Sequence, residues 1–480
     1  MDGKRSRCRV LRWVLLLFLF LCICAMACIA SYVVQRRPIR SLPPKTHPPA
    51  AMPAAALPRH VSNYRVVIVS HELSLTGAPR VCAELAALLA GLGAHVSLGV
   101  LMPTTLADMQ RTVGQLLEGL PGAEAGDSAG LPFELVADGV SPQGDAHALA
   151  LRAGEADVVV LSTAIPDMAN FVRRLAGQRT ARNRVLAWWI HEGASVMSIF
   201  PPTATQLALQ VLAEGAADVA IFPSSSALQW WDEAAVVHGL PSPASPTAPS
   251  LARVVHWGIP PWRAAALTSA AQDEVARAAL RASLGLPQEA LVFVSLASFH
   301  ALKGHEGIVR ALKRAQEKCP PPVPPLYLLA VGHSKGAPGH FPPASMAEWV
   351  DKDASLVFRG ATQSVAAYLA AGDVYVTNTQ LGGETWGLSN LEALVAGRLL
   401  LSSSAGAARE QLAHGVTALL HNASGGGEEE VQGLAENMCA VARDGGLREA
   451  LRREGTRFVT RELNGHAMER AILGTLFRYM

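Results

Sequence analysis

The stretch 373-DVYVTNTQLGGETWGLSNLEALVAGRLLLSSSAGAARE-410 decides the fold class, because its pattern alternates between strand, loop and helix. Residues 373–377 are a short β-branched run that predicts a strand, and residues 380–387 carry three glycines and predict a loop. Ser389 and Glu392 have the spacing of a capping box, which predicts that a helix begins there. Residues 398–401 predict the next strand, so the stretch reads as one parallel β-α-β unit of an α/β protein.

Two carboxylates flank the loop of this unit. A strand-to-helix loop is where an open α/β sheet binds ligands, and the free amides at the helix N-terminus suit a phosphate. For Glu384, this position favours a functional role over the alternative of a solvated loop side chain. For Glu392, a capping role and a ligand-binding role are compatible.

The motif Glu384-x-x-Gly387-x-x-x-x-Glu392-Ala resembles the signature of retaining glycosyltransferases of family 4, which have the GT-B fold. The resemblance continues through a second strand to Ala405-Gly406 and Glu410. It implies that Glu384 lies beside the donor sugar and that Glu392 accepts hydrogen bonds from the ribose hydroxyls. It also implies that the diphosphate is held by the loop amides, those of Gly387, Leu388 and Ser389.

Residues 295–304 follow a predicted strand and resemble the Gly-Arg…Lys-Gly segment of the same family. The match includes Lys303, whose alternative role is that of a solvated lysine at a helix start. At the position of the family arginine this chain has Ser298, so one of two cations for the diphosphate is missing. A leaving diphosphate needs charge stabilisation. Either His300 or another arginine substitutes, or the protein binds nucleotide sugars without transferring them.

The N-terminal half offers two further candidates. The loop 70–79 follows a predicted strand and resembles the family's glycine-rich loop, with Gly77 allowing close backbone approach to the donor. We expect a helix over 80–90, with Pro79 at its first position and Gly91 just past its end.

Residues 188–192 (Trp-Trp-Ile-His-Glu) end another predicted strand. Family resemblance makes His191 a candidate for the reacting centre, with Glu192 behind it as orienting partner. The alternative is a core histidine beneath two tryptophans. The resemblance implies a front-face mechanism in which the leaving phosphate takes the acceptor proton, so no general base is expected.

Arg359 lies at the end of the predicted strand 355–358, where the family binds the nucleotide base. Residues 351–353 (Asp-Lys-Asp) mimic the metal motif of the other large glycosyltransferase fold, but they lie away from the ligand-binding loops and are interpreted as a solvated turn. We therefore expect no metal and no cofactor apart from a nucleotide-sugar co-substrate, UDP- or GDP-linked.

Residues 13–34 are 22 residues without a charge. At about 1.5 Å per residue such a helix spans a bilayer core of about 30 Å. Five basic residues precede it and three follow it closely, which favours a cytosolic N-terminus. We expect a type II signal anchor, with residues 1–12 as cytosolic tail and 35–62 as a Pro/Ala-rich stem. A cleaved signal peptide is the alternative, although its apolar core is usually shorter.

Residues 1–40 hold eight Lys/Arg and one Asp, whereas the 480-residue chain has a formal net charge of +2, so the remainder is mildly acidic at −5. This excludes nucleic acid as an expected partner. Only Cys82, Cys319 and Cys439 lie beyond the apolar segment, and whether two of them pair is left open. The sequon at Asn422 predicts glycosylation in the secretory pathway.

Together these observations predict a GT-B fold, with two doubly wound Rossmann-like domains facing across a cleft behind a transmembrane helix. We place the domains at 63–252 and 253–458, with a helix over 459–480 crossing back. The predicted function is retaining sugar transfer to a glycan, protein or lipid acceptor in the Golgi or endoplasmic reticulum lumen. The alternatives are a catalytically impaired nucleotide- or sugar-binding protein and a nucleotide-sugar epimerase. The oligomeric state is not predicted.

Overall fold

A computed structural model describes most of the chain from residue 61 to residue 478. The described ranges are 61–117, 119–120, 131–137, 147–179, 185–332, 353–360, 362, 364–380, 382–423 and 425–478. The predicted anchor 13–34 and nearly all of the stem 35–62 lie outside them. Within the described ranges no helix is long and apolar enough to cross a membrane.

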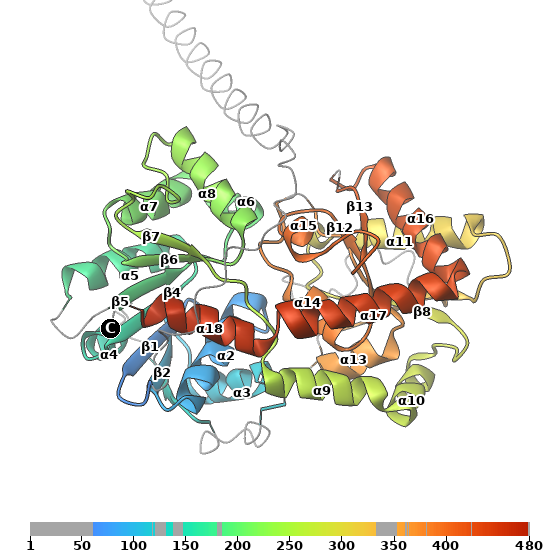
Figure 1. The fold of residues 1–480 in the computed structure, drawn as a ribbon, viewed down its shortest axis with the longest axis horizontal. Helices are drawn as coiled ribbons and strands as arrows, with labels where there is room; N and C mark the ends of the chain where they lie inside the picture. Colours follow the sequence, from blue (N-terminus) through green and yellow to red (C-terminus); the bar gives the residue numbers. More distant parts are fainter. Residues whose placement is uncertain are drawn as a thin grey trace, which may run out of the picture. The chain divides into compact units, whose positions relative to one another are not determined.

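Two parallel sheets organise the described part of the chain (Figure 1). The N-terminal sheet has the order β3-β2-β1-β4-β5-β6-β7, and the C-terminal sheet has the order β10-β9-β8-β11-β12-β13. The strands of the first are β1 (Arg65–Ser70), β2 (His95–Val100), β3 (Glu134–Val136), β4 (Val158–Ser162), β5 (Val185–Trp189), β6 (Val219–Phe222) and β7 (Leu251–Val254). Those of the second are β8 (Leu291–Leu296), β9 (Leu326–Val331), β10 (Leu356–Arg359), β11 (Val374–Thr377), β12 (Leu399–Ser403) and β13 (Leu419–His421).

Helices cover both faces of each sheet. The helices of the N-terminal half are α2 (Gly77–Gly91), α3 (Leu106–Leu116), α4 (His147–Gly154), α5 (Pro166–Gly177), α6 (Ala194–Met197), α7 (Pro202–Ala213) and α8 (Ser225–Val237). Those that follow are α9 (Pro261–Gln272), α10 (Glu274–Leu284), the 3-10 turn η3 (Ala301–Lys303), α11 (His305–Lys318), α13 (Val365–Ala371), α14 (Leu388–Val395), α15 (Ala408–Gln411), α16 (Glu428–Arg443), α17 (Gly445–Glu462) and α18 (Gly465–Leu476).

The strands are apolar along their length because both faces are buried. In β1, Val66 and Ile68 belong to one buried cluster, whereas Val67 and Val69 belong to another. This alternation places successive side chains on opposite faces of the sheet. The predicted pair of Rossmann-like sheets is therefore confirmed.

In each sheet, the strand order reverses beside the strand that comes first in sequence. In the first sheet β1 lies between β2 and β4, and in the second β8 lies between β9 and β11. Ligands in such sheets bind beyond the carboxyl ends of the strands at this reversal. The loops that follow β1, β8 and β11 are therefore the expected binding loops.

Some helix ends differ from those predicted. Helix α2 begins at Gly77, so Pro79 is its third residue, and Gly91 is its last residue instead of the residue beyond it. The left-handed glycine comes two positions later, where Gly93 has a φ of 93°. Strand β7 continues to Val254, two residues past the boundary placed at 252.

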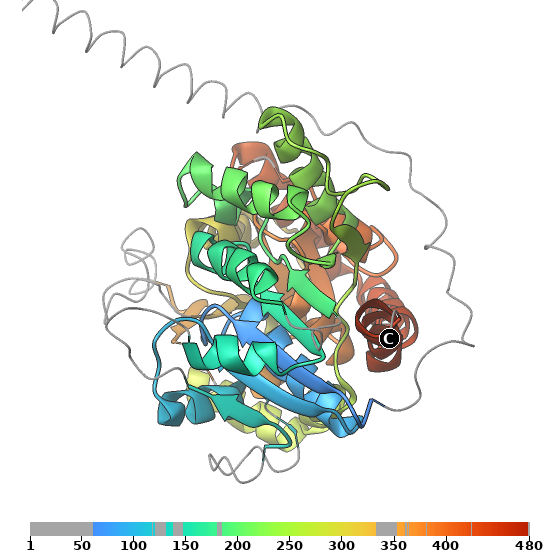
Figure 2. The ribbon, with the colours of Figure 1, turned by 90° about the vertical axis from the view of Figure 1, so that its left-hand side faces the viewer.

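The C-terminal helices connect the two halves. Helix α17 lies along α14 and β12 and continues to Glu462, past the position 459 where a separate last helix was predicted. Helix α18 then lies over the N-terminal half (Figures 1 and 2), where the rings of Tyr64 and Phe477 are 5.3 Å apart. Asn464, which caps α18, forms a β-bridge with Ile259.

A disulfide joins Cys319 at the end of α11 to Cys439 in α16. The two cysteines are 120 residues apart in sequence, which is why spacing alone left their pairing open. Cys82 is free and buried, and burial raises the pKa of its thiol to about 11, so it stays protonated.

Candidate functional site

Lys303 and Glu384 form the centre of the candidate site. Lys303 ends η3 in the loop after β8, and Glu384 lies in the loop after β11. Because β8 and β11 are neighbours at the strand reversal, these loops meet, and Lys303 Nζ donates a hydrogen bond of 2.8 Å to Glu384 Oε2. Each side chain is 25% exposed, so both are accessible to a ligand.

Two glycines allow the loops around this pair to pack closely. Gly304 has a φ of 62°, and a Cβ there would lie 2.1 Å from the carbonyl oxygen of Asn378. Gly406 has a φ of 53°, and its Cβ would lie 1.9 Å from the carbonyl oxygen of Glu384. Larger residues at these two positions would displace the backbone that carries Lys303 or Glu384.

A buried polar network supports the same loops. Asn378 donates from Nδ2 to the carbonyl of Gly304 (3.2 Å), and its Oδ1 lies 2.7 Å from His421 Nε2. Burial lowers the pKa of His421 to about 4, so the ring is neutral and donates from Nε2 at neutral pH. Asn378 was not predicted from the sequence, although its place directly after a predicted strand is a usable signal.

Glu392 lies in the second turn of α14 and is almost fully buried, with 4% of its side chain exposed. Its Oε1 accepts from Arg80 Nη1 (2.9 Å), Arg263 Nε (2.8 Å) and Arg263 Nη2 (2.6 Å). The predicted capping box is therefore wrong, since Gly387 is the N-cap and no side chain caps the helix. Ion pairs with residues distant in sequence outcompete the local contact with Ser389.

The cluster around Glu392 includes a second carboxylate, that of Glu84 in α2. Arg263 Nη1 lies 3.8 Å from Glu84 Oε1, and Trp257 Nε1 donates to Glu84 Oε2 at 2.7 Å. Burial raises the pKa of Glu84, against the opposing effect of the two arginines and Trp257. Arg263 thus bridges two buried carboxylates, an arrangement that was not predicted from the sequence.

The N-termini of α2 and α14 approach each other. A Cβ at Gly77 would lie 3.9 Å from Leu388 Cδ1, so the two predicted donor-binding residues lie side by side. Ser389 hydrogen-bonds the hydroxyl of Tyr375, which also donates to the carbonyl of Leu296. These contacts fix the first turn of α14, and Gly387 at its N-cap brings the free amides to the end of β11.

His191 lies on the N-terminal side of the same loops. Its ring stacks on Trp189 at 5.5 Å, and its carbonyl accepts a 2.7 Å hydrogen bond from Thr385 Oγ1, next to Glu384. Burial lowers the pKa of His191 to about 3, so the ring is neutral. His191 therefore packs against the core through Trp189 and also adjoins the loop that carries Glu384.

Glu192 does not orient the ring of His191 as predicted. Its carboxylate accepts from the backbone amide of Ala164 at 2.7 Å and also from the amides of residues 191 and 192. Burial raises the pKa of Glu192 to about 7 against these bonds. Its role is to hold the backbone at the ends of β4 and β5.

Other predicted residues lie around this centre or apart from it. Arg359, the last residue of β10, donates from Nη1 to the carbonyl of Phe358 at the outer edge of the sheet. His300 accepts from the amide of Leu302 and so caps η3. Asn422 is exposed beyond β13. Asp353 pairs with Lys313, while residues 351 and 352 lie outside the described ranges.

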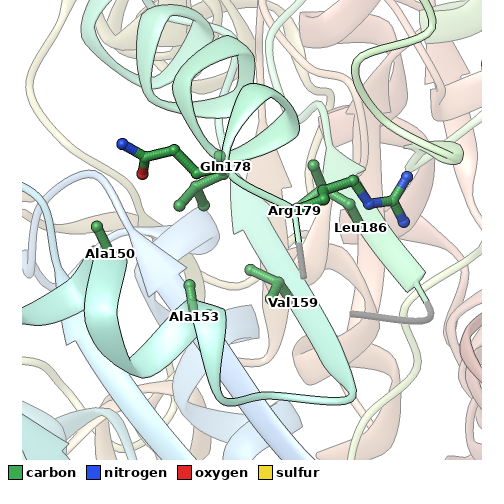
Figure 3. A pocket seen from close by; sticks show the side chains of 8 residues that line it. Ala150, Ala153, Val159, Gln178, Arg179 and Leu186 are labelled. Atoms are coloured by element: carbon green, nitrogen blue, oxygen red, sulfur yellow. The ribbon is translucent and has the colours of Figure 1, made fainter. Parts of the chain in front are cut away.

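No group of His, Cys, Asp and Glu suited to a metal occurs in the part of the chain that the structure describes. A small pocket lies between α4, α5, β4 and β5 (Figure 3). It is at the amino ends of the two strands, opposite to the edge that carries the candidate site. Its lining residues are Ala150, Ala153, Gly154, Val159, Leu175, Gln178, Arg179 and Leu186.

The two parallel sheets, with the loops at their strand reversals brought together, have the arrangement of the GT-B fold. Two family models match the chain: glycosyl transferases group 1 over residues 276–472, and glycosyl-transferase family 4 over residues 62–207. Together they span well over half of the sequence. The chain belongs to glycosyltransferase family 4, and is a retaining glycosyltransferase that uses a nucleotide-sugar donor.

Solved structures share this fold at low sequence identity. HepE from Anabaena, in complex with UDP-glucose, has a TM-score of 0.63 and 16% identity, over 86% of this chain and 99% of HepE. Sucrose-phosphate synthase from Thermosynechococcus elongatus has a TM-score of 0.61 and 18% identity, over 85% of this chain and 97% of the synthase. A UDP-forming trehalose-phosphate synthase from Burkholderia xenovorans has a TM-score of 0.58 and 14% identity, over 87% of this chain and 100% of the synthase. No curated protein sequence matches this chain significantly.

Proposed function

We propose that this protein transfers a sugar from a UDP-linked donor, with retention of configuration, to a glycan, protein or lipid acceptor. The observation that carries the proposal is the Lys303–Glu384 pair at the strand reversal, beside the N-terminus of α14. UDP is preferred over GDP because similar folds were solved with UDP and with UDP-glucose.

The proposed mechanism assigns each side chain a separate task. The diphosphate takes Lys303 as its cation and the amides of residues 387–389 as hydrogen-bond donors. Glu384, released from Lys303, accepts hydrogen bonds from the sugar hydroxyls. The bond between the anomeric carbon and the phosphate oxygen breaks, and that oxygen takes the proton of the acceptor hydroxyl. The acceptor oxygen bonds to the anomeric carbon on the same face of the sugar. Lys303 and the amides stabilise the charge that develops on that phosphate.

The proposal also gives roles to three other predicted residues. Glu392 would bind the ribose, with its negative charge balanced by Arg263. His191 would line the reacting face as a neutral hydrogen-bonding ring. Arg359 would lie near the base, at the carboxyl end of β10.

A shift in unfolding temperature tests the donor class. We expect the full chain, purified in detergent, to be stabilised by UDP and little by GDP. A ligand at 100 times its dissociation constant adds about 2.7 kcal/mol to the free energy of unfolding. Stabilisation by UDP should be followed by release of UDP from UDP-sugars in the presence of acceptors. Binding without any transfer or donor hydrolysis would favour a nucleotide-binding protein instead.

We also propose that the catalytic part faces the lumen of the Golgi or endoplasmic reticulum behind a type II anchor. A disulfide between Cys319 and Cys439 suits an oxidising compartment, and the sequon asparagine Asn422 is exposed. The uncharged segment 13–34 supplies the anchor.

Glycosylation at Asn422 tests this orientation. Expressed in eukaryotic cells, the chain should lose mobility relative to its form treated with a peptide N-glycosidase. The Asn422→Gln variant should run like the treated form, because Asn422 carries the sequon. An unglycosylated wild-type chain that is digested by protease added outside intact microsomes would contradict the luminal orientation.

A further inference from the structure

The candidate site lacks one of the two cations that its family uses for the donor diphosphate. Ser298 occupies that position, and Lys303 is paired with Glu384. Without ligand this pair is neutral, so a diphosphate that takes Lys303 leaves a carboxylate beside it. A second cation is therefore needed near the N-terminus of α14.

Two candidates from the C-terminal half are engaged elsewhere. His300 uses Nδ1 to cap η3, and its exposed ring faces the turn that it caps. Arg359 donates to the carbonyl of its own neighbour Phe358 in β10, which is separated from β11 by β9 and β8. Neither lies at the loop that follows β11.

Arg80 reaches this region from the N-terminal half. It lies in the first turn of α2, three residues after Gly77, whose Cβ position adjoins Leu388 at the start of α14. Its Nη1 donates 2.9 Å to Glu392 Oε1, and 15% of its side chain is exposed. The guanidinium is thus held one helical turn beyond the amides expected to bind the diphosphate.

The ion cluster can release Arg80 without leaving Glu392 unpaired. Arg263 contacts the same carboxylate oxygen through both Nε and Nη2, so Glu392 keeps a cation partner when Arg80 also binds a phosphate. Glu84, the other carboxylate of the cluster, keeps its 2.7 Å hydrogen bond from Trp257 Nε1 and its contact with Arg263 Nη1. A guanidinium has five N–H donors in a fork that suits phosphate oxygens, so Arg80 can contact Glu392 and a phosphate together.

We propose that Arg80, from the N-terminal domain, replaces the missing C-terminal arginine as the second cation for the donor diphosphate. This inference rests on the proposed function, because the phosphate concerned is that of the donor nucleotide. It makes diphosphate binding depend on both domains, since Lys303 and Arg80 belong to different halves of the chain.

Calorimetric titration of the full chain in detergent, with UDP and with uridine, tests the assignment. We expect Arg80→Ala to weaken UDP binding about tenfold, equal to about 1.4 kcal/mol, and to leave uridine binding unchanged because uridine has no phosphate. Arg80→Gln, which keeps a hydrogen-bond donor for Glu392, should show the same loss. Arg111→Ala removes an exposed arginine of α3 and should bind UDP like the wild type.

The variant Ser298→Arg provides the sharper test, because it restores the family arginine. Combined with Arg80→Ala, it should recover most of the lost UDP affinity, which it would not do if Arg80 only joined the two domains. Equal losses for UDP and uridine, or failure of Ser298→Arg to recover UDP binding, would overturn the role of Arg80. A wild-type chain that binds no UDP would overturn the proposed donor class, and this inference with it.

Discussion

Replacement of Glu384 by alanine is expected to lower the rate of sugar transfer about a thousandfold, which is the loss typical of a group that stabilises the transition state. Glu384 is the carboxylate at the strand reversal, and its hydrogen bond joins it to Lys303, the lysine proposed to bind the diphosphate. The fold should survive the change. The ion pair is partly exposed and contributes little to stability, and the backbone of residue 384 is held independently through the amide of Ala407.

Single-turnover transfer from a labelled UDP-sugar, measured beside the unfolding temperature, separates the two effects. Glu428→Ala is the matched control, because this exposed glutamate of the same domain pairs with Arg310 and Arg314 away from the donor loops. The control should retain wild-type turnover. Unchanged turnover in Glu384→Ala would refute the role given to Glu384, whatever the control showed.

The sequence predicts the parts of the site that depend on local pattern. Lys303 and Glu384 each follow a continuous apolar strand, and the signals for both strands lie within a few residues of the side chain. Once the sheet is parallel and doubly wound, the order of strands brings the two loops together. The contact between Lys303 and Glu384 therefore follows from local signals and the general rule of the fold.

The rest of the site depends on contacts between residues distant in sequence. The spacing of Ser389 and Glu392 fits a capping box, yet Glu392 pairs with Arg80 and Arg263, which lie 312 and 129 residues away. Local pattern cannot reveal that a buried carboxylate has two cations available from other helices. The same limit applies to the disulfide between Cys319 and Cys439.

Short edge strands were not predicted from the sequence for another reason. Strands β3 and β13 have three residues each, too few for a repeating apolar pattern. Strand β7 has the sequence Leu-Ala-Arg-Val, and its four residues are only partly buried because it is at the edge of the sheet. Because β7 contains the polar Arg253 and follows a proline-rich loop, its sequence did not indicate a strand.

Replacement of Lys303 by alanine is expected to reduce kcat/KM for sugar transfer about a hundredfold and to weaken UDP binding. The reason is electrostatic. In the wild type the charges of Lys303 and Glu384 cancel. Under the proposed mechanism, a bound diphosphate gains the lysine as its partner. In the variant, the carboxylate of Glu384 stays beside the diphosphate without its cation, so two like charges face each other in a partly desolvated site. A factor of one hundred corresponds to about 2.7 kcal/mol.

A second substitution distinguishes this electrostatic cause from a loss of structure. Glu384→Gln removes the like charge, so the Lys303→Ala, Glu384→Gln double variant should bind UDP more tightly than Lys303→Ala, although it transfers no sugar. Lys318→Ala, which removes an exposed lysine at the end of α11, should leave both binding and transfer unchanged. If UDP binds Lys303→Ala as tightly as the wild type, Lys303 is not the diphosphate cation. If the double variant binds UDP no better than Lys303→Ala, repulsion from Glu384 is not the cause of the loss.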